Sequence, residues 1–190
     1  MIATIHVRAL SAAATRGLLQ IGYRAIPCAL GRSGQRWLKR EGDGATPRGN
    51  WRLLLVYRRG GISQRGRLLG KIIRKCQGWC DAIGNRNYNR PVKLPYRASH
   101  ERLWRADSFY DVVVVLSHNQ RPRVWGAGSA VFLHVSECLA SPTAGCVAIR
   151  RRDMLPLLER CGPGTALVIG PPGDARQKSP IRRARRSLRR

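Results

Sequence analysis

The chain has 190 residues, of which 43% are hydrophobic, and this length and composition suit one globular domain with a single core. The charge is far from balanced, because 36 Lys and Arg residues stand against 10 Asp and Glu residues and give a net charge of +26. No apolar run approaches the roughly 18 residues of a membrane-spanning helix, so none is expected. The first residues also lack the apolar core of a secretory signal, so the sequence shows no export route.

The positive charge favours polyanionic partners such as nucleic acid, acidic lipid surfaces or a carboxylate-rich polymer. Part of it is local, since residues 176–190 carry eight basic side chains and no acidic one. This segment has almost nothing to bury, so we expect residues 171–190 to form a disordered basic tail behind a single domain at residues 1–170. The alternative is that the basic residues form an ordinary solvated surface in an arginine-rich chain. The composition explains this alternative and a polyanion-binding surface equally well.

Short apolar segments rich in β-branched residues predict strands along most of the chain. In chain order they cover residues 2–7, 51–57, 112–116, 131–135, 147–149 and 166–169. Turns rich in Gly, Pro and Asn separate these segments. The pattern predicts a mainly β fold, a sandwich or a barrel, with one or two short helices.

Two further segments are predicted as a loop and a helix. Residues 71–105 are expected to form a long irregular excursion, and loops of this length in a compact domain tend to be functional. Asp153 is expected to cap a helix that has Pro156 in its first turn and stops at Gly162. We expect this helix to cover one face of the sheet.

The six cysteines are too few for a disulfide scaffold. Cys76 and Cys80 have the spacing C-x3-C, but no second Cys or His pair completes a zinc site. A bridge between these two thiols stays open. Cys28, Cys138 and Cys161 stand among small or apolar residues, where a buried and unreactive thiol is expected.

Cys146 has different surroundings, because it follows Gly145 in a turn between two predicted strands. His134 lies at the end of the preceding strand, so the two side chains are expected at neighbouring strand ends. A histidine within hydrogen-bond reach can take the thiol proton and lower the thiol pKa, which creates a nucleophile. Gly145 allows unusual backbone angles, and the N–H groups of Gly145 and Cys146 are candidates for an oxyanion hole. On spacing alone, a buried core histidine beside an unreactive thiol is the competing interpretation.

Three segments together resemble the L,D-transpeptidase (YkuD-type) catalytic domains. Residues 42–53, with Thr-Pro-Arg-Gly at their centre, are similar to the family's Thr-Pro-x-Gly segment. Residues 129–134 are similar to its apolar strand that ends in histidine, and residues 143–146, Thr-Ala-Gly-Cys, to its nucleophile turn. The chain departs from the family pattern at Val135 in place of a glycine, Ala144 in place of a second histidine and Ala148 in place of a polar residue.

The resemblance implies a peptidoglycan enzyme with Cys146 as nucleophile and His134 as general base and acid. Cys146 would attack a stem-peptide carbonyl, release a D-amino acid and form a thioester, which an acceptor amine or water resolves. His134 would be oriented by Ser141, Thr143 or a backbone carbonyl. The candidate substrate-binding residues are Thr143, Arg150, Trp79, Tyr88 and His118.

The resemblance also implies peptidoglycan stem peptides as partners and no metal or organic cofactor. It implies a location in the periplasm or cell envelope, although a cytoplasmic location stays open because no signal peptide is visible. For Trp79 and Tyr88 a second interpretation stays open, in which these aromatic rings anchor the loop. For His118 the second interpretation is a surface or capping role.

Two other functions remain as alternatives. The charge of +26 suits a nucleic-acid-binding protein, although no known recognition motif is present and the Arg residues lack interleaved aromatic residues. The other alternative is a catalytically silent wall-binding module of the same fold. The enzyme hypothesis predicts that Cys146 is alkylated fastest among the six thiols.

Overall fold

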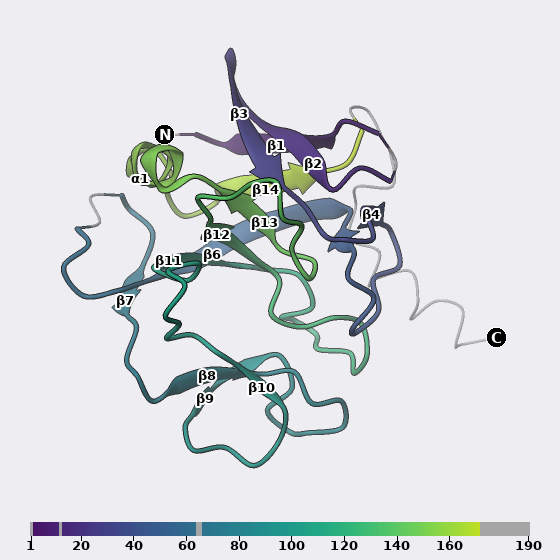
Figure 1. The fold of residues 1–190 in the computed structure, drawn as a ribbon, viewed down its shortest axis with the longest axis vertical. Coiled ribbons are helices and arrows are strands. Elements are labelled where there is room, and N and C mark those ends of the chain that lie inside the picture. The colour runs from purple at the N-terminus through teal and green to yellow at the C-terminus, as the bar shows by residue number, and fades with distance from the viewer. Residues whose placement is uncertain (1, 12, 64–65, 172–190) are drawn as a thin grey trace.

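The structure is a computed structural model that describes residues 2–11, 13–63 and 66–171. The main feature of the fold is one large curved sheet, with a helix beside it and a smaller sheet at the other end of the molecule (Figure 1). The predicted basic tail lies outside the described residues, apart from Pro171.

The described residues form a series of strands, with one helix before the last strand. The bounds are β1 Thr4–Ala9, β2 Arg16–Ile21, β3 Arg24–Ala29, β4 Gln35–Arg36, β5 Thr46–Pro47, β6 Gly49–Arg58, β7 Gly70–Ile72, β8 Gln77–Cys80, β9 Arg90–Lys93, β10 His100–Arg102, β11 Val112–Leu116, β12 Phe132–Val135, β13 Val147–Ile149, α1 Arg151–Glu159 and β14 Ala166–Ile169. Within the described residues, no helix is both long enough and apolar enough to span a bilayer.

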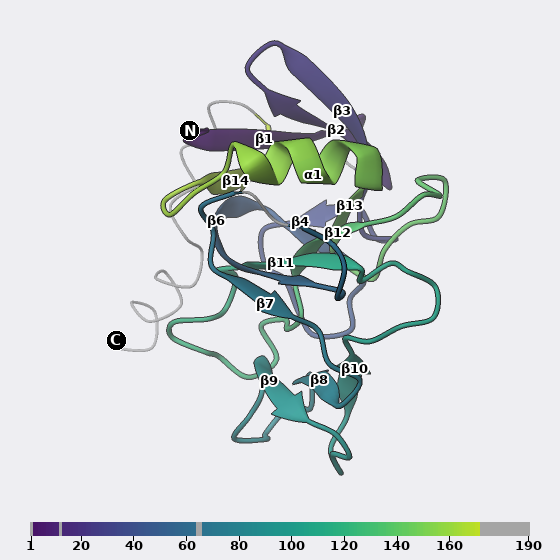
Figure 2. The same cartoon turned by 90° about the vertical axis from the view of Figure 1, so that its left-hand side faces the viewer.

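The excursion at residues 71–105 was expected to be irregular, and this prediction is wrong. Three strands of this segment form a separate sheet. β8 lies between β10 and β9, and both pairings are antiparallel. This sheet lies apart from the large sheet in both side views (Figures 1 and 2). Its strands are only three or four residues long, and Gly78 and Pro91 interrupt the apolar alternation by which a strand is recognised.

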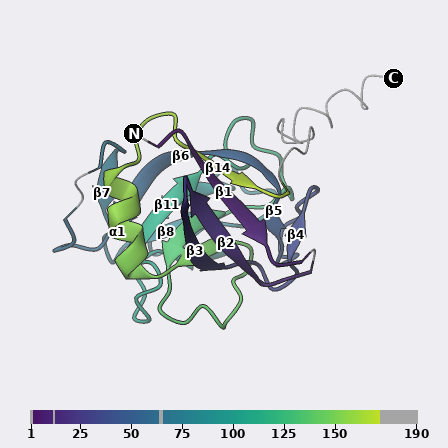
Figure 3. The ribbon, with the colours of Figure 1, turned by 90° about the horizontal axis from the view of Figure 1, so that it is seen from above.

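The large sheet closes on itself. It has nine strands in the order β11-β12-β13-β3-β2-β1-β14-β6-β7, and β6 also pairs with β11. The first half of β6 pairs with β14 and the second half with β11, so this one long strand connects β14 to β11 and closes the sheet. Seen from above, the strands surround the middle of the molecule, with α1 at one side (Figure 3). The predicted mainly β, barrel-like fold is confirmed.

The hairpin of β2 and β3 was not predicted. Gly22 and Tyr23 form the two-residue turn between these strands, and Gly22 has a φ of +56°. A glycine at this position suits the turns that connect twisted antiparallel strands. Pro27 within β3 hides the strand, because a proline cannot donate to a ladder and is read as a break.

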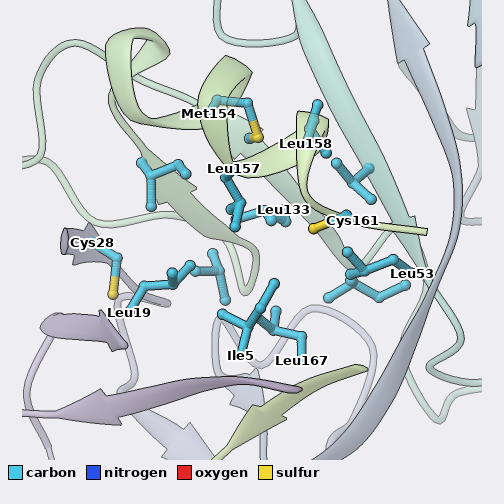
Figure 4. Close-up of a cluster of buried hydrophobic side chains, with 14 of the residues drawn as sticks. Ile5, Leu19, Cys28, Leu53, Leu133, Met154, Leu157, Leu158, Cys161 and Leu167 are labelled. Atoms are coloured by element: carbon cyan, nitrogen blue, oxygen red, sulfur yellow. The ribbon is translucent and has the colours of Figure 1, made fainter. Parts of the chain in front are cut away.

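The main core lies between the closed sheet and helix α1 (Figure 4). The helix occurs where it was predicted, but it begins before Asp153. Arg150 is its N-cap residue and makes no side-chain hydrogen bond there, and Pro156 lies inside the helix. The helix is therefore stabilised by burial of its apolar face rather than by an N-terminal capping side chain. The buried helix residues are Met154, Leu157 and Leu158.

All six cysteines are free thiols, so Cys76 and Cys80 are not bridged. Cys80 is buried and Cys76 is half-buried, at the start of the three-stranded sheet.

Successive residues of β12 point to opposite sides of the sheet, as strand geometry requires. Leu133 and Val135 enter the main core. Phe132 lies on the other side, in a second buried cluster that also contains Cys146. Trp79 of the three-stranded sheet packs on that side, so the space between the two sheets is where the candidate site forms.

Candidate active site

Cys146 and His134 lie at neighbouring parallel strands and on the same side of the sheet. The pairing of β12 and β13 sets His134 opposite Ala148. Cys146 precedes Ala148 by two residues, so it faces the same side as His134. Both residues line one cavity of about 370 Å³. An arrangement on opposite faces, which would separate the thiol from the imidazole, is therefore excluded.

The Cys146 thiol is buried, with 6% of the residue exposed. Its sulfur accepts a hydrogen bond from the Phe132 N–H at 3.4 Å and donates one to the Ala130 carbonyl at 3.3 Å. Among the hydrogen bonds of the described residues, none joins this sulfur to the His134 ring. The S–H must therefore turn away from Ala130 before His134 can take its proton.

Two backbone carbonyls orient His134. Its Nδ1 lies 2.9 Å from the Val135 oxygen and 3.2 Å from the Phe109 oxygen. Carbonyl oxygens only accept hydrogen bonds, so Nδ1 carries the ring proton and Nε2 is left as the acceptor. This is the tautomer that a general base requires. Of the three orienting groups that the sequence left open, the carbonyl is present, rather than Ser141 or Thr143.

Burial keeps the thiol and the imidazole neutral. It raises the pKa of Cys146 to about 12, and the negative charge of Glu101 acts in the same direction. Burial also lowers the pKa of His134, although the hydrogen bonds to Val135 and Phe109 oppose it. We had expected the imidazole to lower the thiol pKa. The resting pair is instead neutral, because burial away from water disfavours the charged form of each group.

The Thr-Pro-x-Gly segment fixes the backbone of the candidate nucleophile. Thr46 of β5 is fully buried, and its Oγ1 donates to the Cys146 carbonyl at 3.3 Å and accepts from the Gly31 N–H at 2.8 Å. Oγ1 of Thr143 donates to the same carbonyl at 2.7 Å. Two hydroxyl groups from distant parts of the sequence therefore hold Cys146 at the start of β13.

Gly145 is required by both its backbone angle and its surroundings. Its φ is +136°, and a Cβ there would lie 2.8 Å from the Ala45 carbonyl oxygen. Its N–H donates to Thr143 Oγ1 at 3.1 Å, so the group that we had expected to face an oxyanion is engaged inside the turn. Thr143 lines the cavity, but its hydroxyl is committed to Cys146 and Gly145 instead of to a substrate.

Charged side chains from distant segments line the same cavity, and sequence reasoning missed them. The length of the excursion was the one signal, since it contributes three of these residues. Tyr110 donates to the Glu101 carboxylate at 2.8 Å, and burial raises the pKa of Glu101. The basic lining residues are Arg32, Lys39 and Arg105, and the acidic ones are Glu41, Asp81 and Glu101. Among the described residues, no group of three or more His, Cys, Asp and Glu side chains is placed to hold a metal ion.

Trp79 and Tyr88 were candidates for a substrate wall, but neither is among the described residues that line the cavity. Trp79 is buried edge-to-face against Phe132 with ring centroids 5.2 Å apart, and its Nε1 donates to Asn89 at 2.9 Å. Tyr88 is also buried and donates to Glu41 at 2.5 Å. These two rings anchor the excursion, because burial of their large aromatic surface stabilises the folded segment.

His118 and Arg150 also lie outside the set of described cavity-lining residues. His118 is 4% exposed, donates through Nε2 to the Ala127 carbonyl at 2.9 Å and packs edge-on against Trp51. Burial lowers the pKa of His118 to about 4, so it is a neutral core histidine rather than a surface or substrate-binding one. Arg150 precedes α1 as its N-cap residue, and this position does not support its predicted contact with substrate.

Cys138 is exposed, contrary to our prediction of a buried and unreactive thiol. Hydrogen bonds from the Ser141 side chain and from nearby backbone N–H groups lower the pKa of Cys138. Cys28 and Cys161 are buried as predicted, and burial raises their pKa values to about 12 and about 11. Access and thiolate content govern alkylation, so Cys138, not Cys146, is expected to react first with a small reagent.

A closed, mainly β sheet that brings a thiol and an imidazole into one charged cavity defines a class of domains suited to acyl transfer through sulfur. The chain matches the YkuD family model, described as the L,D-transpeptidase catalytic domain, over residues 14–169. This match covers most of the chain, and the protein therefore belongs to the L,D-transpeptidase catalytic domain family.

No curated protein matches the chain at a significant level. Among solved structures, the chain is similar to the "Structure of Bdellovibrio bacteriovorus Bd1075", with a TM-score of 0.45 and 14% sequence identity. The similarity covers 97% of this chain and 55% of that one, so this chain spans about half the length of that protein.

Proposed function

We propose that this protein is a cysteine-dependent L,D-transpeptidase that cross-links or modifies peptidoglycan stem peptides through a thioester on Cys146. One observation carries the proposal: Cys146 and His134 face the same side of neighbouring strands and line the same cavity. The family membership supports the reaction class. We place its action in the cell envelope, because the substrate is found there.

The first half-reaction starts from the neutral pair. Nε2 of His134 accepts the thiol proton as the Cys146 sulfur attacks a stem-peptide carbonyl, so an ion pair exists only when substrate fills the cavity. The carbonyl oxygen takes up negative charge in the tetrahedral intermediate. Its collapse breaks the C–N bond, Nε2 gives the proton to the departing amine of the D-amino acid, and the acyl group remains on sulfur as a thioester.

In the second half-reaction an acceptor amine attacks the thioester carbonyl. Nε2 of His134 takes a proton from that amine and returns it to the Cys146 sulfur as the C–S bond breaks. Water in place of the amine gives hydrolysis, a carboxypeptidase side activity. The hydrogen bonds from Nδ1 to Phe109 and Val135 keep the ring in one tautomer and one orientation through both halves.

The charged lining supports a peptide substrate that carries groups of both signs. Arg32 and Arg105 suit a carboxylate, and Asp81 and Glu101 suit an ammonium group. The Oδ1 atom of Asp81 is buried with no hydrogen-bond partner among the described residues. Such an atom is costly unless a ligand pairs with it, so we assign the acidic side of the cavity to an amino group of the stem peptide.

Replacement of the thiol tests the proposal, in a Cys138→Ser background that removes the exposed thiol. The parent is expected to release a D-amino acid from a tetrapeptide stem and to gain the mass of a carbapenem on Cys146. Cys146→Ala is expected to lose the adduct and to lower turnover by roughly 10³-fold or more. Turnover is followed by release of the D-amino acid, and the adduct by intact-protein mass spectrometry.

The matched control is Cys28→Ala, which removes a buried thiol outside the cavity and is expected to keep both activities. The proposal fails if the parent forms no adduct and shows no turnover, or if Cys146→Ala retains both.

A further inference from the structure

Lys39 lies buried on the wall of the cavity, where a lysine needs a specific partner. The residue is 9% exposed and lines the cavity together with Cys146. Its Nζ donates to Asp43 Oδ1 at 2.5 Å and to the Arg40 carbonyl at 3.2 Å. An ammonium group has three N–H donors, so these two contacts among the described residues leave one for the cavity.

Two glycines provide the space for the Lys39 side chain. A Cβ on Gly128 would lie 2.7 Å from Lys39 Cγ, and a Cβ on Gly145 would lie 3.3 Å from Nζ and 3.4 Å from Cε. Both glycines have a positive φ, which side chains rarely adopt. The ammonium group therefore packs against the turn that carries Cys146.

Asp43 fixes the position of this cation. Its carboxylate accepts hydrogen bonds from the Arg40 N–H at 2.8 Å and the Ala45 N–H at 2.9 Å. Burial alone would raise the pKa of Asp43, but these bonds and the one from Lys39 outweigh it and hold the pKa below its usual value. A carboxylate that is held at both oxygens keeps the lysine side chain in one place.

We propose that the ammonium group of Lys39 stabilises the Cys146 thiolate electrostatically, from the Gly145 side of the cavity. The inference rests on the function proposed above. It explains how a thiol in a buried site is activated, since the neutral imidazole of His134 supplies no positive charge before proton transfer. The charge of Lys39 lowers the pKa of Cys146 and so opposes the effect of burial.

The alternative is that Lys39 only forms a structural ion pair with Asp43. The two roles are distinguished by removing each partner in turn. An electrostatic role of Lys39 predicts that the two changes shift the pKa of Cys146 in opposite directions. Loss of Lys39 removes the cation from the cavity, whereas loss of the Asp43 charge leaves that cation without its neutralising partner. A structural role predicts that both changes loosen the same ion pair and alter the thiol in the same direction.

The experiment measures the rate of Cys146 alkylation by iodoacetamide against pH, in the Cys138→Ser background, by mass spectrometry of the labelled peptide. Lys39→Met is compared with Asp43→Asn and with the double variant, in which no unpaired buried charge remains and folding is protected. Lys75→Met serves as the matched control, because it removes one positive charge from a residue that does not line the cavity.

We expect Lys39→Met to raise the apparent pKa of Cys146 by about one unit and to slow alkylation at pH 8 about tenfold, and the double variant to change both in the same direction by a smaller amount. Asp43→Asn is expected to lower the apparent pKa and to speed alkylation. Lys75→Met is expected to follow the parent. The same profile in the double variant and the parent, or slowing by Asp43→Asn, overturns the role of Lys39.

The outcome for Lys39 is separable from the outcome for the enzyme. A parent protein that acquires a carbapenem on Cys146 but shows no effect of Lys39 keeps the proposed function and loses the inference. A parent that acquires no carbapenem loses the proposed function, and the inference with it.

Discussion

Burial controls how Cys146, His134 and His118 titrate, and pH acts on stability through these three groups. Burial raises the pKa of Cys146 from 9.0 to about 12. The folded state therefore holds this proton more tightly than the unfolded chain, and the contribution to stability is complete below pH 9 and is lost as the pH rises towards 12. For His134 and His118 burial lowers the pKa, so their contributions are lost on acidification.

His118 provides the clearest test of this effect. Its pKa falls from 6.5 to about 4, so its contribution is complete above pH 6.5 and is lost as the pH falls towards 4. The shift corresponds to about 3 kcal/mol of unfolding free energy. We expect His118→Gln to be less stable than the parent at pH 7.5 but to lose less stability between pH 7.5 and 4.5, as measured by urea unfolding.

A matched variant shows whether the change in acid sensitivity comes from the buried position of His118 or from the removal of any histidine. His6 is exposed on β1, and His6→Gln is expected to show the pH dependence of the parent. An acid sensitivity that is unchanged in His118→Gln would contradict the assignment of His118 as a neutral core residue.

At the scale of elements, the parallel pair β12–β13 separates packing from chemistry. Leu133, Val147 and the buried residues of α1 lie on the core side, whereas Cys146 and His134 lie on the cavity side. A period of two residues makes this separation unavoidable once one residue of each strand is placed. Changes in the helix should therefore act on stability without acting on the thiol.

Leu157 in α1 tests this separation, because its side chain is 3% exposed and belongs to the main core. Leu157→Ala is expected to cost about 2–5 kcal/mol and to lower Tm by roughly 5–15 °C. Leu155 is only partly buried, and Leu155→Ala is expected to cost less. Both are measured by thermal unfolding, and the Cys146 alkylation profile at 25 °C should match the parent. A changed profile in Leu157→Ala would show that the two sides are coupled.

At the scale of the whole molecule, the net charge of +26 is the property that the proposed enzyme does not explain. The proposed reaction takes place in the cavity, but a field of this size attracts any polyanion. Residues 171–190 lie almost entirely outside the described residues, and their sequence is rich in arginine. We therefore keep the tail as the proposed polyanion-binding segment, separate from the cavity.

A salt titration tests this separation. The full chain is expected to bind random DNA weakly, with an affinity that falls steeply with salt, because binding releases counterions. A chain that ends at Gly170 is expected to show a slope smaller by roughly 0.9 for each phosphate that the tail neutralises in the full chain. Its carbapenem adduct should be unchanged. An equal slope in both chains would place polyanion binding on the folded part instead.

Local patterns in the sequence were sufficient for the strand-rich fold and for the placement of Cys146 and His134 at neighbouring strands. Strands 112–116, 147–149 and 166–169 occur at the predicted bounds, because continuous β-branched runs report a buried strand directly. The β2–β3 hairpin and the small sheet were not predicted, because Pro27 and Gly78 are not typical of strands. Pairing with neighbouring strands stabilises the extended conformation at both positions.

Only the tertiary structure decided the protonation of the candidate pair and the charge of its surroundings. Burial sets the neutral state of Cys146, and two carbonyls set the tautomer of His134. Lys39, Asp81 and Glu101 reach the cavity from segments far apart in the chain. Desolvation and the meeting of distant charges arise from the folded arrangement alone, and no spacing in the sequence encodes them.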